Sequence, residues 1–284
     1  QDEGVYATAK HFPGHGDTST DSHHTLPVVK FDKNRLDDVE LYPYKELIKN
    51  GLTSVMVAHL NVPSIEPREN YPTSISYNVV TNILKNELQF EGLIFTDALN
   101  MKGASNFKKP GDIDLEAFLA GNDVLLFAEN VPVAIKKFNE AKKDGRLTEE
   151  RLAYSVKKIL AYKYKANLHN YQPIALENLY NDLNAVEFEA LNYQLYENAV
   201  TVIKNDTKSI PVAQLDKEKI AYVKLGNDSS DVFLTQLKNY ANVTEITSKN
   251  LDSVLVELQD YTKVIIGYHK SDGAWRNHNL TFRE

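Results

Sequence analysis

Short apolar runs alternate with amphipathic stretches through roughly the first 165 residues of the chain. This alternation is the pattern of β/α units built around a parallel sheet. Strands are predicted at residues 5–10, 53–59, 92–97 and 123–127, and helices at 41–49, 76–88, 115–120, 133–143 and 149–164. This region is therefore predicted to have an α/β fold.

Four strands that are each followed by helix make half of an eight-stranded, TIM-type (β/α)8 barrel. Half a barrel leaves two open sheet edges, which are a liability unless other strands pair with them. Gln1 is neither an initiator methionine nor the start of a signal-peptide pattern. We therefore expect residues 1–167 to be the C-terminal half of the barrel, with a preceding N-terminal half supplying the other strands and completing the site.

The sequence pattern changes after about residue 168. Residues 168–210 are predicted to be a linker with a connecting helix at 186–199 and a strand at 200–204. Residues 211–284 are predicted to be part of a second α/β sandwich domain. Its strands are expected at 220–225 and 264–268, and its helices at 232–240 and 251–259.

Charge and composition argue against several classes of function. The formal net charge of −7, without any basic run, argues against a nucleic-acid partner, because such proteins neutralise phosphates with a basic surface. No apolar stretch approaches the length of about 18 residues that spans a membrane. The chain has no cysteine, which excludes disulfides, thiolate metal ligands and cysteine nucleophiles. The compartment stays open between cytoplasmic and exported.

The densest polar cluster is at residues 10–24, KHFPGHGDTSTDSHH, directly after the first predicted strand. In a β/α barrel this loop would lie at the C-terminal face, where such barrels carry their chemistry. A solvated, turn-rich connection is the simplest alternative. A metal site is another, because nitrogen and oxygen ligands are present at His11, His15, Asp17, Asp21, His23 and His24. These residues lack a recognised ligand spacing, so no metal and no other cofactor is expected.

Asp97 closes the apolar strand GLIFTD at residues 92–97. One interpretation is an N-cap for the following helix, a position that aspartate suits. The other places the carboxylate in the mouth of the barrel. On the same face as the loop at 10–24, a carboxylate opposite a His/Asp pair is a catalytic arrangement.

Several stretches together resemble a known family. They are KHFPGHGDT at residues 10–18, DSH at 21–23, Leu26-Pro27, VMVAH at 55–59, PTSIS at 72–76 and GLIFTD at 92–97. Their order and spacing resemble the signature of bacterial β-N-acetylglucosaminidases of glycoside hydrolase family 3. The resemblance covers about residues 4–165, and beyond residue 170 it is weak.

The resemblance implies hydrolysis of terminal, non-reducing β-linked N-acetylglucosamine with retention, in muropeptides or chitin-derived oligosaccharides. A retaining glycosidase needs a carboxylate nucleophile and a group that first protonates the leaving oxygen and then deprotonates water. Asp97 matches the family nucleophile, and Asp21 with His23 resembles its acid/base dyad. Imidazole suits this task because its ordinary pKa of about 6.5 lies near working pH.

The resemblance also implies sugar-binding residues. Lys10 and His11 would hydrogen-bond sugar hydroxyls, unless they are an ordinary strand-end pair facing solvent. His59 would either line the site or pack beneath it, and His24 is expected to be a bystander.

Two further functions stay open. Phosphorolysis is one, because imidazole repels an incoming phosphate less than a carboxylate does. A non-catalytic carbohydrate-binding protein on the same fold is the other. A β-glucosidase of the family is disfavoured, because those enzymes lack the Asp-x-His loop.

Overall fold

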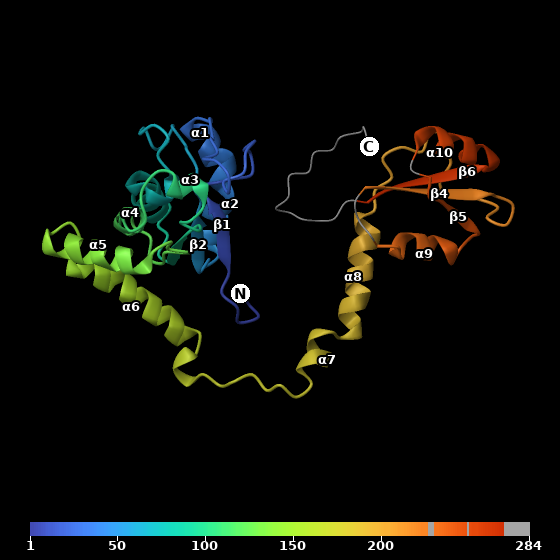
Figure 1. Ribbon diagram of the computed structural model, residues 1–284. Helices are drawn as coiled ribbons and strands as arrows, with labels where there is room; N and C mark the ends of the chain where they lie inside the picture. The colour runs from blue at the N-terminus through green and yellow to red at the C-terminus, as the bar shows by residue number, and fades with distance from the viewer. Residues whose placement is uncertain (227–229, 249, 270–284) are drawn as a thin grey trace. The chain divides into compact units, whose positions relative to one another are not determined.

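The computed structural model describes residues 1–226, 230–248 and 250–269 (Figure 1). The chain divides into two compact units, Gln1–Ile174 and Ala175–Glu284. The boundary between the units falls inside the segment 168–210, for which the sequence predicts a linker.

The first unit contains a parallel sheet in the order β1 (Thr8–Phe12), β2 (Ser54–Val57) and β3 (Leu93–Thr96). These strands confirm the predictions at 5–10, 53–59 and 92–97, although β1 begins three residues later than expected. Because parallel strands run in one direction, the loops that follow β1, β2 and β3 leave the same edge of the sheet. The same end of the sheet, where the strands finish, therefore carries the polar loop after Phe12, the segment after Val57 and Asp97.

The fourth predicted strand, 123–127, is wrong except at one residue. Val124 forms a single parallel bridge with Phe95 of β3. The backbone N–H of Leu126 donates to the side-chain hydroxyl of Thr96 at 3.0 Å rather than to a backbone carbonyl. A side-chain acceptor has therefore replaced the next ladder bond, and the strand ends there.

Helices and helical turns connect the strands of the first unit. They are α1 (Lys33–Arg35), η1 (Leu36–Glu40), α2 (Tyr42–Lys49), η2 (Thr73–Ile75), η3 (Asn78–Glu87), α3 (Lys102–Ser105), α4 (Asp112–Ala120), α5 (Val131–Lys143), α6 (Glu149–Lys165) and η4 (Leu168–Asn170). The predicted helix 76–88 forms as the π-helix η3, in which Leu88 N–H donates to Ile83 O. Hydrophobic periodicity places its apolar side toward the sheet, because Val80 and Leu84 are buried in the core with Ile94 of β3.

A buried carboxylate secures the segment between β2 and η3. Glu66 is fully buried and accepts hydrogen bonds at 2.7 Å from Arg68 Nε and Nη2, and at 2.5 Å from Ser76 Oγ. Burial raises the pKa of Glu66, but the hydrogen bonds from Arg68 and Ser76 outweigh burial and hold the pKa below its usual value. The ionised form of Glu66 therefore stabilises the fold.

Replacing Glu66 by glutamine is expected to lower the free energy of unfolding by about 1–2 kcal/mol at neutral pH, because charge-assisted bonds become neutral ones. The folded pKa of Glu66 lies below its unfolded value. Its stabilisation is therefore present above the unfolded pKa and is lost as pH falls through the folded pKa. Urea unfolding should show a constant difference between the two proteins near neutral pH and a narrowing difference below about pH 4.5.

Glu69→Gln, at an exposed position in the same segment, is the matched control for Glu66→Gln. Equal losses in the two variants would contradict the role of the buried carboxylate, and so would a Glu66→Gln effect that does not change with pH.

The described residues of the second unit form a parallel sheet in the order β5-β4-β6. Its elements are α7 (Leu179–Leu183), α8 (Val186–Ala199), β4 (Ile220–Gly226), α9 (Val232–Lys238), β5 (Val243–Ile246), α10 (Leu251–Glu257), η5 (Leu258–Asp260) and β6 (Lys263–His269). Figure 1 shows α9 and α10 on the two sides of this sheet. The strands predicted at 220–225 and 264–268 are confirmed, whereas β5 was not predicted. Residues 270–284 of the predicted second domain lie outside the described residues.

The predicted strand at 200–204 is wrong. Its residues adopt no regular structure, and Val200, Val202 and Ile203 are exposed. β-branched residues favour a strand only where a neighbouring strand can pair with them, and no described strand pairs with this segment.

Candidate active site

The loop after β1 carries the predicted acid/base pair in direct contact. The Nδ1–H of His23 donates to Asp21 Oδ1 at 2.7 Å, and the backbone N–H of His23 donates to the same oxygen at 2.9 Å. These two bonds, the backbone one first, lower the pKa of the Asp21 carboxyl, so Asp21 stays ionised beside the ring. The pairing assigns Nε2 of His23 as the nitrogen that would exchange a proton with a ligand.

Three contacts hold this loop in place; from the sequence His15 was considered only as a possible metal ligand, and Gly103 was given no role. His15 contacts Thr18 Oγ1 through Nδ1 at 2.8 Å and Ser22 Oγ through Nε2 at 3.2 Å. The carbonyl of the buried Ser22 accepts the N–H of Gly103 at 3.3 Å. A Cβ at Gly103 would lie 3.0 Å from the Thr25 carbonyl oxygen and 3.1 Å from that of Ser22, so the close approach favours glycine. The only sequence signal for a role of His15 was its position in the run KHFPGHGDT, and no sequence signal pointed to Gly103.

Asp97 follows β3 with a fixed backbone and one hydrogen-bonded carboxylate oxygen. Its N–H donates to Val57 O at 2.8 Å, and its Oδ1 accepts the N–H of Ala98 at 2.8 Å. Its Oδ2 lies 3.7 Å from His11 Nε2. The interpretation of Asp97 as a helix N-cap is wrong, because the next helix, α3, has Met101 at its N-cap. Oδ2 is therefore the oxygen that can act on a ligand.

His11 lies among the charged groups of the site. Burial lowers its pKa, the Asp97 carboxylate raises it, and the nearby Lys10, His15 and His23 lower it further, with a net decrease. A neutral imidazole can both donate and accept a hydrogen bond, as a ligand rich in hydroxyl groups requires. The structure thus brings His11 beside Asp97, with Lys10 adjacent and exposed on β1.

His59 lies beneath the site and is fully buried. Its Nε2 is 2.9 Å from the carbonyl oxygen of Ala98, and its Nδ1 is 2.7 Å from Ser74 Oγ. Burial lowers the pKa of His59, against the raising effects of the Ala98 bond and the Asp97 charge. Of the two positions considered for His59, the structure favours packing under the site over lining it.

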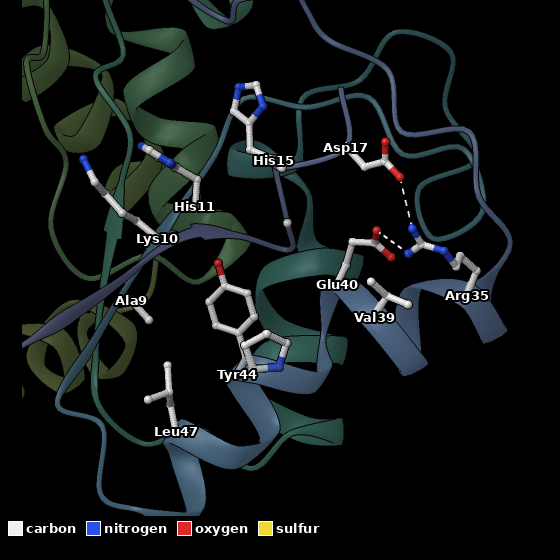
Figure 2. A pocket seen from close by; sticks show the side chains of 13 residues that line it. Ala9, Lys10, His11, His15, Asp17, Arg35, Val39, Glu40, Tyr44 and Leu47 are labelled. Atoms are coloured by element: carbon white, nitrogen blue, oxygen red, sulfur yellow. Dashed lines mark hydrogen bonds and ion pairs between the residues drawn. The ribbon is translucent and has the colours of Figure 1, made fainter. Parts of the chain in front are cut away.

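A cavity of about 800 Å³ opens between β1 and the η1–α2 segment (Figure 2). Lys10, His11 and His15 lie on its β1 side, and Tyr44 and Leu47 of α2 lie on the other. Asp97, Asp21 and His23 do not line this cavity. It therefore borders the candidate active site without containing it.

An ion-paired group forms the far wall of the same cavity. Arg35 donates from Nη1 to Glu40 Oε1 at 2.6 Å and from Nη2 to Asp17 Oδ2 at 3.0 Å, as the dashed lines of Figure 2 mark. Gly14 packs directly on Glu40 at a φ of 144°, and a Cβ there would lie 2.7 Å from Glu40 Cβ. The first turn of the loop therefore tolerates only glycine.

The loop histidines do not form a metal centre in the structure as described. Within residues 1–226, 230–248 and 250–269, no three histidine, aspartate or glutamate side chains converge as metal ligands. His24 is exposed on the loop, as expected of a bystander. Over the same residues, every helix is too short or too polar to cross a membrane.

The fold and the site define a class of protein: a parallel α/β protein with an Asp–His pair in the loop after one strand and a carboxylate after another strand of the same sheet. Residues 1–162 match the family model described as the glycosyl hydrolase family 3 N terminal domain. The chain therefore belongs to glycosyl hydrolase family 3.

Named relatives agree with this membership. The chain is 33% identical over 226 residues to beta-hexosaminidase A of Pseudoalteromonas piscicida, a match that covers 72% of this chain and 37% of the relative. It is 37% identical over 131 residues to a beta-hexosaminidase of Nitrosospira multiformis, covering 46% of this chain and 37% of the relative. The chain thus spans well under half the length of these curated relatives.

A solved structure extends the likeness to the fold. The family 3 beta-N-acetylglucosaminidase from a Paenibacillus strain is 29% identical to this chain with a TM-score of 0.73. That match covers 94% of this chain and 54% of the solved one. The mixed α/β architecture with parallel sheets is therefore shared with this family.

Proposed function

We propose that this chain carries the catalytic residues of a retaining β-N-acetylglucosaminidase. The observation that carries the proposal is the Asp21–His23 pair. Its Oδ1 and Nδ1 atoms lie 2.7 Å apart, in the loop at the same end of the sheet as Asp97. A carboxylate nucleophile and a separate acid/base are what retaining hydrolysis needs. The names of the hexosaminidase relatives support a hexosamine as the sugar, and the name of the Paenibacillus beta-N-acetylglucosaminidase supports N-acetylglucosamine in particular.

The proposed first step forms a glycosyl-enzyme. Asp97 Oδ2 attacks the anomeric carbon, and the leaving oxygen departs with the proton from His23 Nε2. In the second step, His23 takes a proton from water as the water oxygen attacks the anomeric carbon and frees Asp97. Asp21 keeps the imidazole oriented and favours its protonated form through both steps. Lys10 and His11 hydrogen-bond the sugar hydroxyls.

We further propose that residues 1–167 are the C-terminal half of a (β/α)8 barrel, and that residues 211–284 belong to a second α/β domain. Among the described residues β1 pairs with β2 alone, and the cavity that Lys10 and His11 of β1 help to line also contacts Pro43, Tyr44 and Leu47. A strand with an unpaired edge is where a preceding β/α unit would pair, and the adjoining groove leaves room for it. The other strands and further sugar contacts would then come from an N-terminal half.

The substrate class we propose is an oligosaccharide that ends in non-reducing β-linked N-acetylglucosamine. Peptidoglycan-derived muropeptides and chitin fragments both present this end. The full-length protein that carries this chain is the form to test, because the proposed barrel needs both halves.

Full-length protein is expected to release nitrophenol from 4-nitrophenyl β-N-acetylglucosaminide and to act poorly on the matching β-glucoside. Product analysis should give free N-acetylglucosamine in phosphate buffer as well as in phosphate-free buffer. If N-acetylglucosamine 1-phosphate is the main product, the protein is a phosphorylase and not a hydrolase. If the protein binds the sugar without turnover, it is a carbohydrate-binding protein and the proposal of an enzyme fails.

A further inference from the structure

We propose that His59 and Ser74 are positioning residues that hold the backbone after the nucleophile, so that Asp97 Oδ2 faces the substrate. The inference rests on the proposed function. It assigns a role to a fully buried polar pair, His59 and Ser74.

The chemistry of the contacts fixes the direction of both hydrogen bonds. The carbonyl oxygen of Ala98 can only accept, so His59 Nε2, 2.9 Å away, carries the proton. Burial keeps the ring neutral by lowering its pKa, which leaves Nδ1 as an acceptor. The hydroxyl of Ser74, 2.7 Å from Nδ1, therefore donates to it.

Ala98 connects this pair to the nucleophile. Its N–H holds Asp97 Oδ1 at 2.8 Å, while its carbonyl is held by His59. These two groups belong to consecutive peptide units, so fixing the carbonyl restricts the rotation that aims the N–H. With Oδ1 fixed, the carboxylate plane is set and Oδ2 is presented toward His11.

Ser74 is itself held by the surrounding chain. Its carbonyl accepts from Asn122 Nδ2 at 2.8 Å. The neighbouring Thr73 donates from Oγ1 to Ala58 O at 2.6 Å and accepts from Leu60 N–H at 3.1 Å. Ser74 and His59 are both fully buried, where polar groups are costly unless hydrogen-bonded. The pair is thus rigid, as a device that orients a catalytic group requires.

Two amide substitutions separate positioning from packing. In His59→Gln, the side-chain N–H₂ reaches the place of Nε2 and can still donate to Ala98 O. In His59→Asn, the shorter side chain keeps an acceptor for Ser74 but does not reach Ala98 O. On the full-length protein, kcat for the nitrophenyl substrate should fall about 10- to 100-fold in the asparagine variant, because a misaligned nucleophile costs rate. KM should change little, and glutamine should recover most of kcat.

Ser74→Ala provides an independent variant that keeps the imidazole in place. Its kcat should fall about 3- to 10-fold with KM unchanged, because the ring loses one of its two anchors. If thermal unfolding shows that His59→Asn does not fold, the Ser74→Ala result decides whether the positioning role holds.

Equal kcat in the asparagine and glutamine variants, or a change in KM alone, would overturn the positioning role. Parent-like kcat in Ser74→Ala would also count against it. An Asp97→Asn variant measured alongside separates the two failures. If it stays active, the proposed function fails; if it is inactive while the His59 and Ser74 variants work normally, only the positioning inference fails.

Discussion

Asp97→Asn is expected to abolish measurable turnover of 4-nitrophenyl β-N-acetylglucosaminide, a loss of at least about 1,000-fold in kcat/KM. The amide retains an oxygen that can accept the Ala98 N–H, so the local backbone is preserved. What it loses is the negative charge that makes Oδ2 nucleophilic, and in the proposed first step a lone pair of Oδ2 attacks the anomeric carbon. The loss should appear in kcat rather than in sugar affinity.

Asp38→Asn is the matched control for the charge change, because Asp38 is exposed on η1 and has no part in the proposed chemistry. Parent activity in Asp38→Asn together with inactive, folded Asp97→Asn is the expected result. An active Asp97→Asn protein would show that another group is the nucleophile.

His23→Ala is expected to reduce steady-state turnover by about 100- to 10,000-fold, as loss of an acid/base group does. Nitrophenol is a good leaving group and needs little protonation, so the first step should survive better than the second. The glycosyl-enzyme should therefore accumulate. Mass spectrometry should find one N-acetylglucosamine residue attached to the peptide that contains Asp97.

Azide gives a sharper test of His23, because this anion attacks without a general base. Added azide should restore turnover in His23→Ala and yield the glycosyl azide, with no comparable gain in the parent. His24→Ala, the exposed neighbour, is the control and should behave like the parent. A burst of nitrophenol without any sugar on the Asp97 peptide would contradict the assignment of both residues.

Local pattern was sufficient for most of the secondary structure. The apolar alternation located β1, β2, β3, β4 and β6, because a buried strand must carry consecutive or alternating apolar side chains. It missed β5, whose short VTEI sequence alternates weakly, and it misjudged segments whose outcome depends on neighbours. At 123–127, the side-chain hydroxyl of Thr96 accepts the Leu126 N–H in place of a backbone carbonyl of β3. At 200–204, none of the strands that the structure describes pairs with the segment.

For the site too, some features follow from local sequence and others depend on tertiary contacts. Asp21 and His23 are two residues apart, so a turn alone brings the carboxylate to the ring, and the sequence by itself determined this pair. It also determined that Asp97 closes a strand on the face that carries the loop. Tertiary structure decided which Asp97 oxygen accepts the Ala98 N–H, and that His59 is fully buried. His59 follows β2, Ser74 lies in η2 and Ala98 follows β3, so the sequence did not predict their contacts, because hydrogen bonds between distant segments have no signature in local spacing.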